Sequence, residues 1–378
     1  MSIYLDNAAT TPIAPEVIEE MIPFMRETFG NPSSIHSYGR KAKDALETAR
    51  RKVATHLGCS PAEICFTSGG TEADNLAIHT AVHKQGVKMI VSTRIEHKAV
   101  LYCIEHAVKM GWVEAYWLKV DEQGDIDMTE LEDVLHKYEN VLVSLMHGNN
   151  EIGNMIDLHK VGTLCKAYDA LFHSDTVQTM AHYPFNLDET PVDYITGSAH
   201  KFHGPKGVGF LYHRRELGAL AMMHGGGQER NHRAGTENIY GIIGMAKAMD
   251  LAYAGHEAQE KHIRALKKQM ITELKEAIPE IAFNGDSESE DSLYTVLNVN
   301  FPKTEIASMM LFRLDLEGVA CSGGSACSSG SSAGSHVLAE IKTCHDGPSV
   351  RFSFSRYTRV SDITSCVEKL AHLMTADV

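Results

Sequence analysis

Lys201 is the residue of this sequence whose setting most clearly predicts chemistry. It ends the segment Ser198–Lys201, which follows the apolar run Tyr194–Thr196 and is rich in small residues and histidine. A lysine at the end of a strand, close to anion-binding groups, could form a Schiff base with an aldehyde cofactor. The ordinary alternative is a surface lysine in a turn.

Asp175 strengthens this hypothesis, because it ends another apolar run, Leu171–Ser174. A strand-end aspartate that precedes such a lysine is the pairing expected for pyridoxal 5'-phosphate. The lysine would hold the aldehyde carbon of the cofactor. The aspartate would keep the pyridine nitrogen protonated, so that the ring can act as an electron sink.

A small-residue segment, Thr67–Glu72, lies between a predicted strand and a predicted helix. The free N–H groups and the positive dipole end at a helix N-terminus suit a phosphate group, to which Thr71 would add a hydroxyl. Ser198 and His200 offer further phosphate ligands. The alternative is an ordinary helix cap at Ser68 or Thr71.

Polar residues after other predicted strands could complete the site. His97 could stack on a flat ring and transfer protons, or it could be an exposed loop histidine. Asn150 could hydrogen-bond the phenolic oxygen of the ring, and Gln178 could address the same oxygen. The adjacent residues Asn149 and Asn150 are equally good turn formers.

Cys327 and Arg351 stand in the C-terminal third of the chain. Cys327 lies in Gly-Gly-Ser-Ala-Cys-Ser-Ser-Gly, a setting that suits a mobile nucleophile better than a core residue, although a linker with an incidental cysteine is the alternative. Cys321 is more typical of a packing residue at a strand end. Arg351 could bind a substrate carboxylate through two parallel hydrogen bonds, or it could form a surface ion pair.

Composition limits the possible functions. The 378 residues carry a formal net charge of −14, which argues against general nucleic-acid binding. No apolar run approaches the roughly 20 residues of a membrane span, and residues 1–6 do not indicate a secretion signal. The eight cysteines include no C-x-x-C pair, so we expect no metal site and no disulfide framework. These features predict a cytoplasmic protein.

Strand-like runs alternate with helical patterns from about residue 60 to about residue 215, which is typical of a mainly parallel sheet buried by helices. Ligands bind such sheets beyond the carboxyl ends of the strands, where the candidate residues fall. The predicted strands are Ile64–Thr67, Met89–Ser92, Val113–Leu118, Val141–Met146, Leu171–Ser174, Tyr194–Thr196 and Val208–Tyr212. The predicted helices are Thr71–His83, Ala99–Lys109, Met128–Tyr138 and Leu158–Tyr168, preceded by Ser37–Leu57.

The rest of the chain predicts a second, smaller α/β domain. A long helical stretch, Asn238–Ala277, leads into it. We expect a large domain of residues 15–258 and a small domain of residues 1–14 and 259–378. The predicted elements of the small domain are a strand at Leu297–Phe301, a helix at Glu305–Leu314, a Gly/Ser loop at 322–335, a strand at Val350–Ser355 and a helix at 361–375.

Taken together, these segments resemble the cysteine desulfurases, which are pyridoxal-phosphate enzymes of the class V aminotransferase group. The resemblance keeps the family's order of motifs over nearly the whole chain. The matching segments are Tyr4–Pro12, Gly30–Ser34, Thr67–Asn75, Glu96–Val100, Asn149–Gly153, Asp175–Gln178, Ser198–Lys201, His224–Arg230, Arg233–Thr236, Ser325–Ser328 and Arg351–Ser353. It implies the fold type I architecture, with a seven-stranded sheet in the large domain and the cysteine loop in the small one.

The resemblance also implies roles for single residues. The catalytic residues would be Lys201, His97 and Cys327, and Cys327 would take the sulfur. Arg351 and Asn31 would hold the substrate carboxylate. The cofactor-binding residues would be Lys201, Asp175, Gln178, Asn150, Gly70, Thr71, Ser198, His200 and, from the other subunit of a homodimer, Thr236.

The reaction implied by the resemblance converts L-cysteine to L-alanine and leaves a persulfide on Cys327. A sulfur-acceptor protein, either an iron–sulfur scaffold or a tRNA-thiolation protein, would then receive the sulfur. Related enzymes of iron–sulfur assembly often have a longer tail after the last helix than this sequence, which ends at Val378, so we keep another acceptor open. The alternative activity on the same scaffold is that of a selenocysteine lyase or another β-eliminating enzyme.

Overall fold

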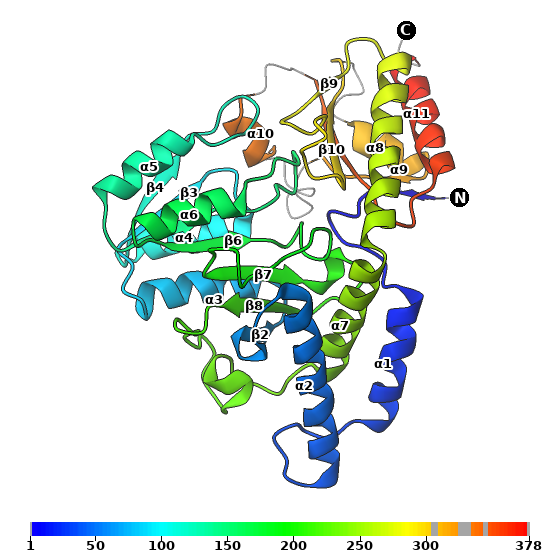
Figure 1. Cartoon of the computed structure of the whole chain (residues 1–378). Helices are drawn as coiled ribbons and strands as arrows, with labels where there is room; N and C mark the ends of the chain where they lie inside the picture. The colour runs from blue at the N-terminus through cyan, green and yellow to red at the C-terminus, as the bar shows by residue number, and fades with distance from the viewer. Residues whose placement is uncertain (1, 304–308, 324–333, 343–346, 376–378) are drawn as a thin grey trace.

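The computed structural model describes residues 2–303, 309–323, 334–342 and 347–375 (Figure 1). Its main element is a seven-stranded sheet with the strand order β2-β8-β7-β6-β5-β3-β4. These strands are β2 (Ile64–Thr67), β3 (Met89–Thr93), β4 (Glu114–Leu118), β5 (Val141–Ser144), β6 (Leu171–Asp175), β7 (Tyr194–Ser198) and β8 (Gly209–His213). Each predicted strand is confirmed to within two residues at either end.

The sheet is mainly parallel, as predicted. Strands β4, β3, β5, β6 and β7 run parallel to one another, whereas β8 runs antiparallel to both β7 and β2. The carboxyl ends of the parallel strands therefore meet at one edge of the sheet. That edge is where side chains from different strand ends can form one site.

Helices cover both faces of the sheet (Figure 1). Helices α3 (Gly70–His83) and α4 (Lys98–Lys109) share a buried cluster with Ile90 and Leu142 on one face. Helices α5 (Met128–Lys137) and α6 (Leu158–Ala167) share a larger cluster with Val91 and Val143 on the other face. Because strand side chains alternate between faces, residues 90 and 91 point into different cores.

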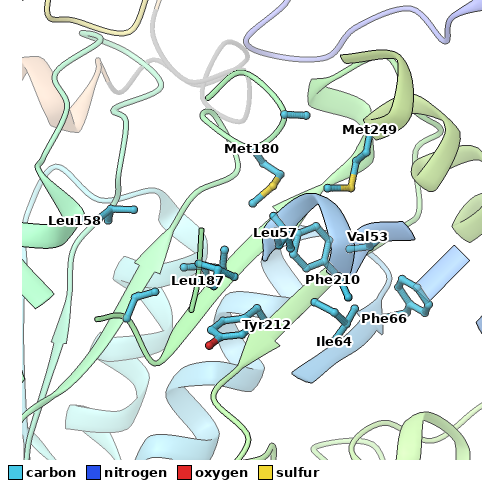
Figure 2. Packing of buried hydrophobic residues seen from close by; sticks show 14 of the residues in the cluster. Val53, Leu57, Ile64, Phe66, Leu158, Met180, Leu187, Phe210, Tyr212 and Met249 are labelled. Carbon is cyan, nitrogen blue, oxygen red and sulfur yellow. The ribbon is translucent and has the colours of Figure 1, made fainter. Parts of the chain in front are cut away.

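Helix α2 (Ser37–Leu57) shows why its sequence forms a helix at the sheet surface. Ala42, Leu46, Ala49, Val53 and Leu57 recur at helical spacing and are all buried. Val53 and Leu57 lie close to Ile64 and Phe66 of β2 and to Phe210 of β8 (Figure 2). Burial of each large apolar side chain contributes about 1.5–3 kcal/mol to folding.

The predicted helical stretch over residues 238–277 is helical but is divided in two. The structure has two helices, α7 (Ile239–Ala254) and α8 (His256–Ala277), and Gly255 separates them. Glycine costs helical stability because its backbone has more freedom to lose than that of other residues. Helix α1 (Pro15–Glu27), which we did not predict, packs against α7 and begins at a proline, a residue that suits the first helical turn.

The C-terminal part has its own sheet and hydrophobic core. Strand β10 (Val296–Asn300) pairs antiparallel with β12 (Ser349–Ser353) and with β9 (Ala282–Phe283). A short parallel pair joins β1 (Ile3–Tyr4) to β11 (Val319–Ala320). The helices of this part are α8, α9 (Met310–Leu316), α10 (His336–Glu340) and α11 (Val360–Thr375).

The hydrophobic core of this second unit is separate from the clusters on the sheet. Ile3 and Leu5 belong to it, which agrees with the expectation that the first residues pack with the C-terminal part. The exact domain bounds stay a prediction. Parts of the predicted helix at 305–314 and of the predicted loop at 322–335 lie outside the described residues. Among the residues that are described, no helix is long and apolar enough to cross a membrane.

Candidate active site

A cavity of about 200 Å³ lies where the strand ends of the sheet meet the N-terminal segment and β12. It brings together ten of the predicted site residues: Gly70, Thr71, His97, Asn150, Asp175, Gln178, Ser198, His200, Lys201 and Arg351. The other lining residues in the described part of the chain are Ala8, Ala9, Asp74, Met146 and Val177. The roles of the predicted residues stay predictions, but their convergence is a property of the fold.

Lys201 ends a short 3₁₀ turn, residues 199–201, that directly follows β7. Its Nζ donates hydrogen bonds to the carbonyl oxygens of Ala8 and Ala9, the latter at 2.9 Å. The alternative of a surface lysine is therefore wrong, because Lys201 lines the cavity and its amine is held by the N-terminal segment. Gln178 donates to the same Ala8 carbonyl at 3.0 Å.

Asp175 is the last residue of β6, is buried and lines the cavity. Its Oδ1 accepts a hydrogen bond from the backbone N–H of Val177 at 2.8 Å. Burial, followed by the nearby Asp74 carboxylate, raises the pKa of Asp175 to about 6. A cation in the cavity beside Asp175 would stabilise its ionised form.

Asp74 is a second buried acid that the sequence analysis did not identify. It lies on α3 and is 1% exposed, and its Oδ1 has no hydrogen-bond partner among the described residues. This oxygen lies 3.5 Å from Nε2 of His173. Burial raises the pKa of Asp74 to about 7. The sequence feature that could have identified Asp74 is its position four residues after Gly70, on the face of α3 that also carries Ala77.

His97 caps α4, where its Nδ1 accepts from the backbone N–H of Ala99 at 3.2 Å. It is not the exposed loop histidine of the alternative interpretation, because it lines the cavity. Burial lowers the pKa of His97, and the cation of Lys201 lowers it further, whereas Asp175 opposes this shift. The imidazole is therefore held toward its neutral form, which can accept a proton.

The two adjacent asparagines have different roles in the structure. Asn149 forms the turn, since its Oδ1 accepts from the N–H groups of Glu151 and Ile152 at 2.8 and 3.1 Å. Asn150 lines the cavity instead. Asn149 also ties the turn to the segment that follows β3, by donating to the carbonyl oxygen of Ile95 at 3.0 Å. The turn former and the candidate ligand are thus separate residues.

The N-terminus of α3, which lines the cavity, suits an anion. Helix α3 begins with Gly69 at its cap position, and no side chain caps its first N–H groups. Neither Ser68 nor Thr71 is the helix cap, so the ordinary alternative for this segment is wrong. A Cβ atom at Gly70 would lie 2.6 Å from Cγ2 of Val177, which explains why the smallest residue stands there. Backbone N–H groups of this kind bind phosphate.

Arg351 lies on β12 and is 1% exposed, so it does not form the surface ion pair of the alternative interpretation. Its Nη1 donates to the carbonyl oxygen of Asn150 at 2.8 Å, and its Nη2 donates to Oδ1 of Asp6 at 3.0 Å. Asp6 was not predicted as a site residue. A buried guanidinium that lines a cavity can bind a carboxylate there.

Two predicted residues of the described chain, Asn31 and Thr236, do not line the cavity. Asn31 is exposed, and its Oδ1 accepts from the N–H of Ser33 at 2.9 Å, in the loop before α2. Thr236 is exposed after the segment at residues 228–231. The catalytic assignment of Cys327 falls outside the described residues. Cys321 packs against the C-terminal core, as predicted.

The donor set of the cavity fits a flat, phosphorylated ring that carries a protonated nitrogen. The lining of the cavity includes the uncapped N-terminus of α3, the hydroxyl of Ser198 and two buried acids, Asp175 and Asp74. Lys201 lies in the same cavity, where its amine can meet an aldehyde. Within the described residues, no group of three or more His, Cys, Asp or Glu side chains could hold a metal ion.

Comparison with known proteins agrees with this geometry. The profile of the family described as Aminotransferase class-V matches residues 3–365. A relative from Dictyoglomus turgidum named Cysteine desulfurase IscS is 43% identical over 379 residues, which cover 98% of this chain and 94% of the relative. The solved structure of a NifS-like protein is 35% identical, with a TM-score of 0.91 and full coverage of both chains. A structure titled SspA in complex with cysteine is 29% identical, with a TM-score of 0.81, and covers 95% of this chain and 100% of that chain.

The fold, the cavity and the match over residues 3–365 place the chain in the class-V aminotransferase family. Relatives at about 40% identity over almost the full length further define its group. The chain belongs to the cysteine desulfurases.

Proposed function

We propose that this protein uses pyridoxal 5'-phosphate to convert L-cysteine to L-alanine and carries the released sulfur as a persulfide on Cys327. The observation that supports this proposal most is the single cavity that gathers Lys201, Asp175, His97 and Arg351. A strand-end lysine, a buried acid, a neutral imidazole and a buried guanidinium are the groups that such a reaction needs.

The cofactor would be held at both ends of the cavity. The N-terminal N–H groups of α3, together with Thr71, Ser198 and His200, would bind its phosphate, and Asp175 would pair with the ring nitrogen. Asn150 and Gln178 would hydrogen-bond the phenolic oxygen of the ring. When bound, pyridoxal phosphate supplies an electron sink that weakens the bonds at the substrate's Cα and Cβ. Burial lowers the pKa of His200 to about 4, so its imidazole is neutral at pH 7.

The protein's own groups would orient the substrate and move its protons. Arg351 would bind the carboxylate of L-cysteine, because its guanidinium is buried and faces the cavity. The amine of Lys201 would take the proton from the substrate's Cα. His97, whose imidazole is held toward its neutral form, would transfer a proton near the substrate's sulfur.

The sulfur transfer would take place on Cys327. Its thiolate would attack the substrate sulfur, so that an S–S bond forms while the substrate's C–S bond breaks and its electron pair stays with the carbon. After this carbon takes up a proton, the products are L-alanine and a persulfide on Cys327. Cys321 is a poor alternative, because burial raises the pKa of its thiol well above the ordinary value.

The proposal includes a homodimer in the cytoplasm and a protein acceptor for the sulfur. Thr236 would bind the phosphate in the partner's cavity, which agrees with its exposed position in this chain. Phe29, Ile35 and Tyr38 are exposed next to Asn31, and Ile35 is 91% exposed. Large apolar side chains grouped in this way are typical of a surface that a second copy covers. The acceptor would be an iron–sulfur scaffold or a tRNA-thiolation protein.

The first test measures the alanine released from L-cysteine in the presence of a reductant, for the native protein and for Cys327→Ala. We expect alanine from the native protein and a loss of at least about 100-fold in the variant, because the variant lacks the nucleophile. Equal rates for the two proteins would exclude Cys327 as the sulfur carrier.

A second test addresses the cofactor separately. The native protein should show an absorbance band near the visible edge after loading with pyridoxal phosphate, and borohydride should abolish that band. Lys201→Ala should not form the borohydride-sensitive adduct, whereas Cys327→Ala should form it normally. A persistent adduct in Lys201→Ala would overturn the role of this lysine.

A further inference from the structure

We infer that Asp6 is a positioning residue that holds Arg351 when no substrate is bound and competes with the substrate carboxylate for the same guanidinium. Ser322, which hydrogen-bonds the same Asp6 oxygen, would retain Asp6 when the substrate arrives. This inference rests on the proposed function, since it concerns the carboxylate of the amino acid that Arg351 would bind.

Among the described residues, Arg351 has hydrogen-bond partners at both Nη atoms but none at Nε. Nη1 donates to the carbonyl oxygen of Asn150 at 2.8 Å, and Nη2 donates to Oδ1 of Asp6 at 3.0 Å. Nε is buried and has no partner among the residues that the structure describes. A carboxylate bound by two parallel hydrogen bonds needs Nε–H and an Nη2–H on the same edge of the guanidinium. Asp6 already uses Nη2, so the two carboxylates would share this nitrogen.

The backbone around Asp6 is fixed to the strand that carries Arg351. Ser353 donates its N–H to the carbonyl oxygen of Leu5 at 2.7 Å, and the side chain of Asn7 donates to the carbonyl oxygen of Ser353 at 2.8 Å. The side chain of Asp6 is 19% exposed, in contrast to the 1% of Arg351. The carboxylate of Asp6 can therefore turn while its backbone stays in place.

Ser322 connects Asp6 to the cysteine segment. Its Oγ donates to Oδ1 of Asp6 at 2.8 Å, which is the oxygen that also accepts from Arg351. The backbones of Ser322 and Arg351 exchange two hydrogen bonds, at 3.2 and 2.6 Å. Cys327 follows Ser322 by five positions in the sequence. A substrate carboxylate on Arg351 would thus change the contacts of a residue close to Cys327 along the chain.

Electrostatics gives the direction of the effect. Two carboxylates beside one guanidinium repel each other, so the charge of Asp6 weakens the binding of a ligand carboxylate. When the ligand takes Nη2, the hydroxyl of Ser322 still satisfies Asp6. Without that hydroxyl, the release of Asp6 from Arg351 costs more, because a partly buried carboxylate loses its remaining partner.

The test titrates the cofactor-loaded protein with L-alanine, which has the amino and carboxylate groups of the substrate but no sulfur, and follows the absorbance of the cofactor. We expect Asp6→Asn to lower the Kd for L-alanine roughly three- to tenfold. We expect Ser322→Ala to raise it roughly two- to threefold. The opposite signs distinguish competition from a general structural defect, and Ser322→Ala keeps the inference testable if Asp6→Asn folds poorly.

Two controls isolate the carboxylate. Asp362→Asn removes the same charge from a surface pair with Arg359, 2.9 Å apart, and should leave the Kd unchanged. L-Alaninamide lacks the negative charge of the ligand, so Asp6→Asn should not improve its binding. An equal gain for L-alanine and L-alaninamide would contradict the competition.

The outcomes separate this inference from the function on which it rests. If the native protein forms no cofactor band and releases no alanine from L-cysteine, the proposed function fails, and this inference fails with it. If the band and the reaction are normal but the Kd for L-alanine is unchanged or higher in Asp6→Asn, only the role of Asp6 is overturned. An unchanged Kd in Ser322→Ala would overturn the retention of Asp6 by this serine.

Discussion

Two buried acids, Asp74 and Asp175, give the candidate site its electrostatic character. Each has a raised pKa because water cannot reach its carboxyl group. In the protein without its cofactor, these carboxyl groups keep their protons to a higher pH than they would in an unfolded chain. A cationic ring nitrogen beside Asp175 would favour the ionised forms. The binding of the cofactor and the charge of the acids are therefore linked.

The pH dependence of stability tests the environment of Asp74. The pKa of an aspartate is about 4 in an unfolded chain, and burial raises that of Asp74 to about 7. Folding therefore takes up a proton between these values, so the free energy of unfolding of the cofactor-free protein falls as pH rises through this window. The contribution of Asp74 to this fall in the free energy of unfolding is on the order of 3 kcal/mol, and Asp74→Asn should abolish it. Urea unfolding at pH 5 and pH 8 measures the free energy of unfolding of both proteins. An equal change between the two pH values in the native protein and in the variant would contradict the raised pKa of Asp74.

At the scale of elements, an ion pair with α2 holds a strained segment of the chain at residues 229–231. Glu229, Arg230 and Asn231 have positive φ values of 43°, 56° and 67°, a region that disfavours non-glycine residues. Arg50 of α2 donates two hydrogen bonds of 2.7 Å to the carboxylate of Glu229. This buried pair connects α2 to the chain that leads to Thr236.

Removal of the charge of Glu229 should destabilise the protein strongly. Glu229→Gln removes the buried counter-charge of Arg50 and leaves only the more exposed Glu47, whose Oε1 lies 3.1 Å from Nε of Arg50, so we expect a loss of about 3 kcal/mol in the free energy of unfolding. Glu105→Gln is the matched control, because it removes a similar charge from an exposed pair with Arg94, 2.9 Å apart. The control should change stability by less than about 1 kcal/mol. Denaturant titration measures the loss of stability in both variants. Equal losses would contradict the prediction that the buried pair contributes more to stability than the exposed pair.

At the scale of the whole molecule, the proposed homodimer depends on the exposed apolar group of Phe29, Ile35 and Tyr38. Ile35→Asp should convert the dimer to monomers, because burial of a carboxylate in an interface is unfavourable. Affinity for pyridoxal phosphate should fall at the same time, since the partner's Thr236 would be lost. Val360→Asp changes an apolar residue that is 60% exposed on α11 and should leave the dimer intact.

Sedimentation or light scattering at micromolar concentration measures this assembly. A native protein that stays monomeric at that concentration would contradict the homodimer, as would an Ile35→Asp variant that remains dimeric with unchanged cofactor affinity. Dimer dissociation without a change in cofactor affinity would contradict only the contribution of Thr236.

Local patterns in the sequence predicted most of the sheet and the order of the cavity residues. Strands β2 to β8 and helix α2 could be predicted, because apolar runs and helical spacing are patterns among neighbouring residues. The break at Gly255 was missed because both flanking segments are helical. Asp6 could not be identified, because its partner Arg351 lies 345 residues away along the chain. Asn31 was assigned through the resemblance, and a single chain does not bring it into the cavity.

The position of the N-terminal segment has a consequence for the synthesis of the protein. Residues 3–9 are synthesised well before their partners, which include β11, Ser353 and the amine of Lys201, and the bond from Asn7 to Ser353 spans 346 residues. The wall of the cavity that these residues form cannot close until nearly the whole chain has emerged. Contacts so distant in sequence form slowly. We therefore expect the cofactor to bind only after β12 has been synthesised and has met residues 3–9.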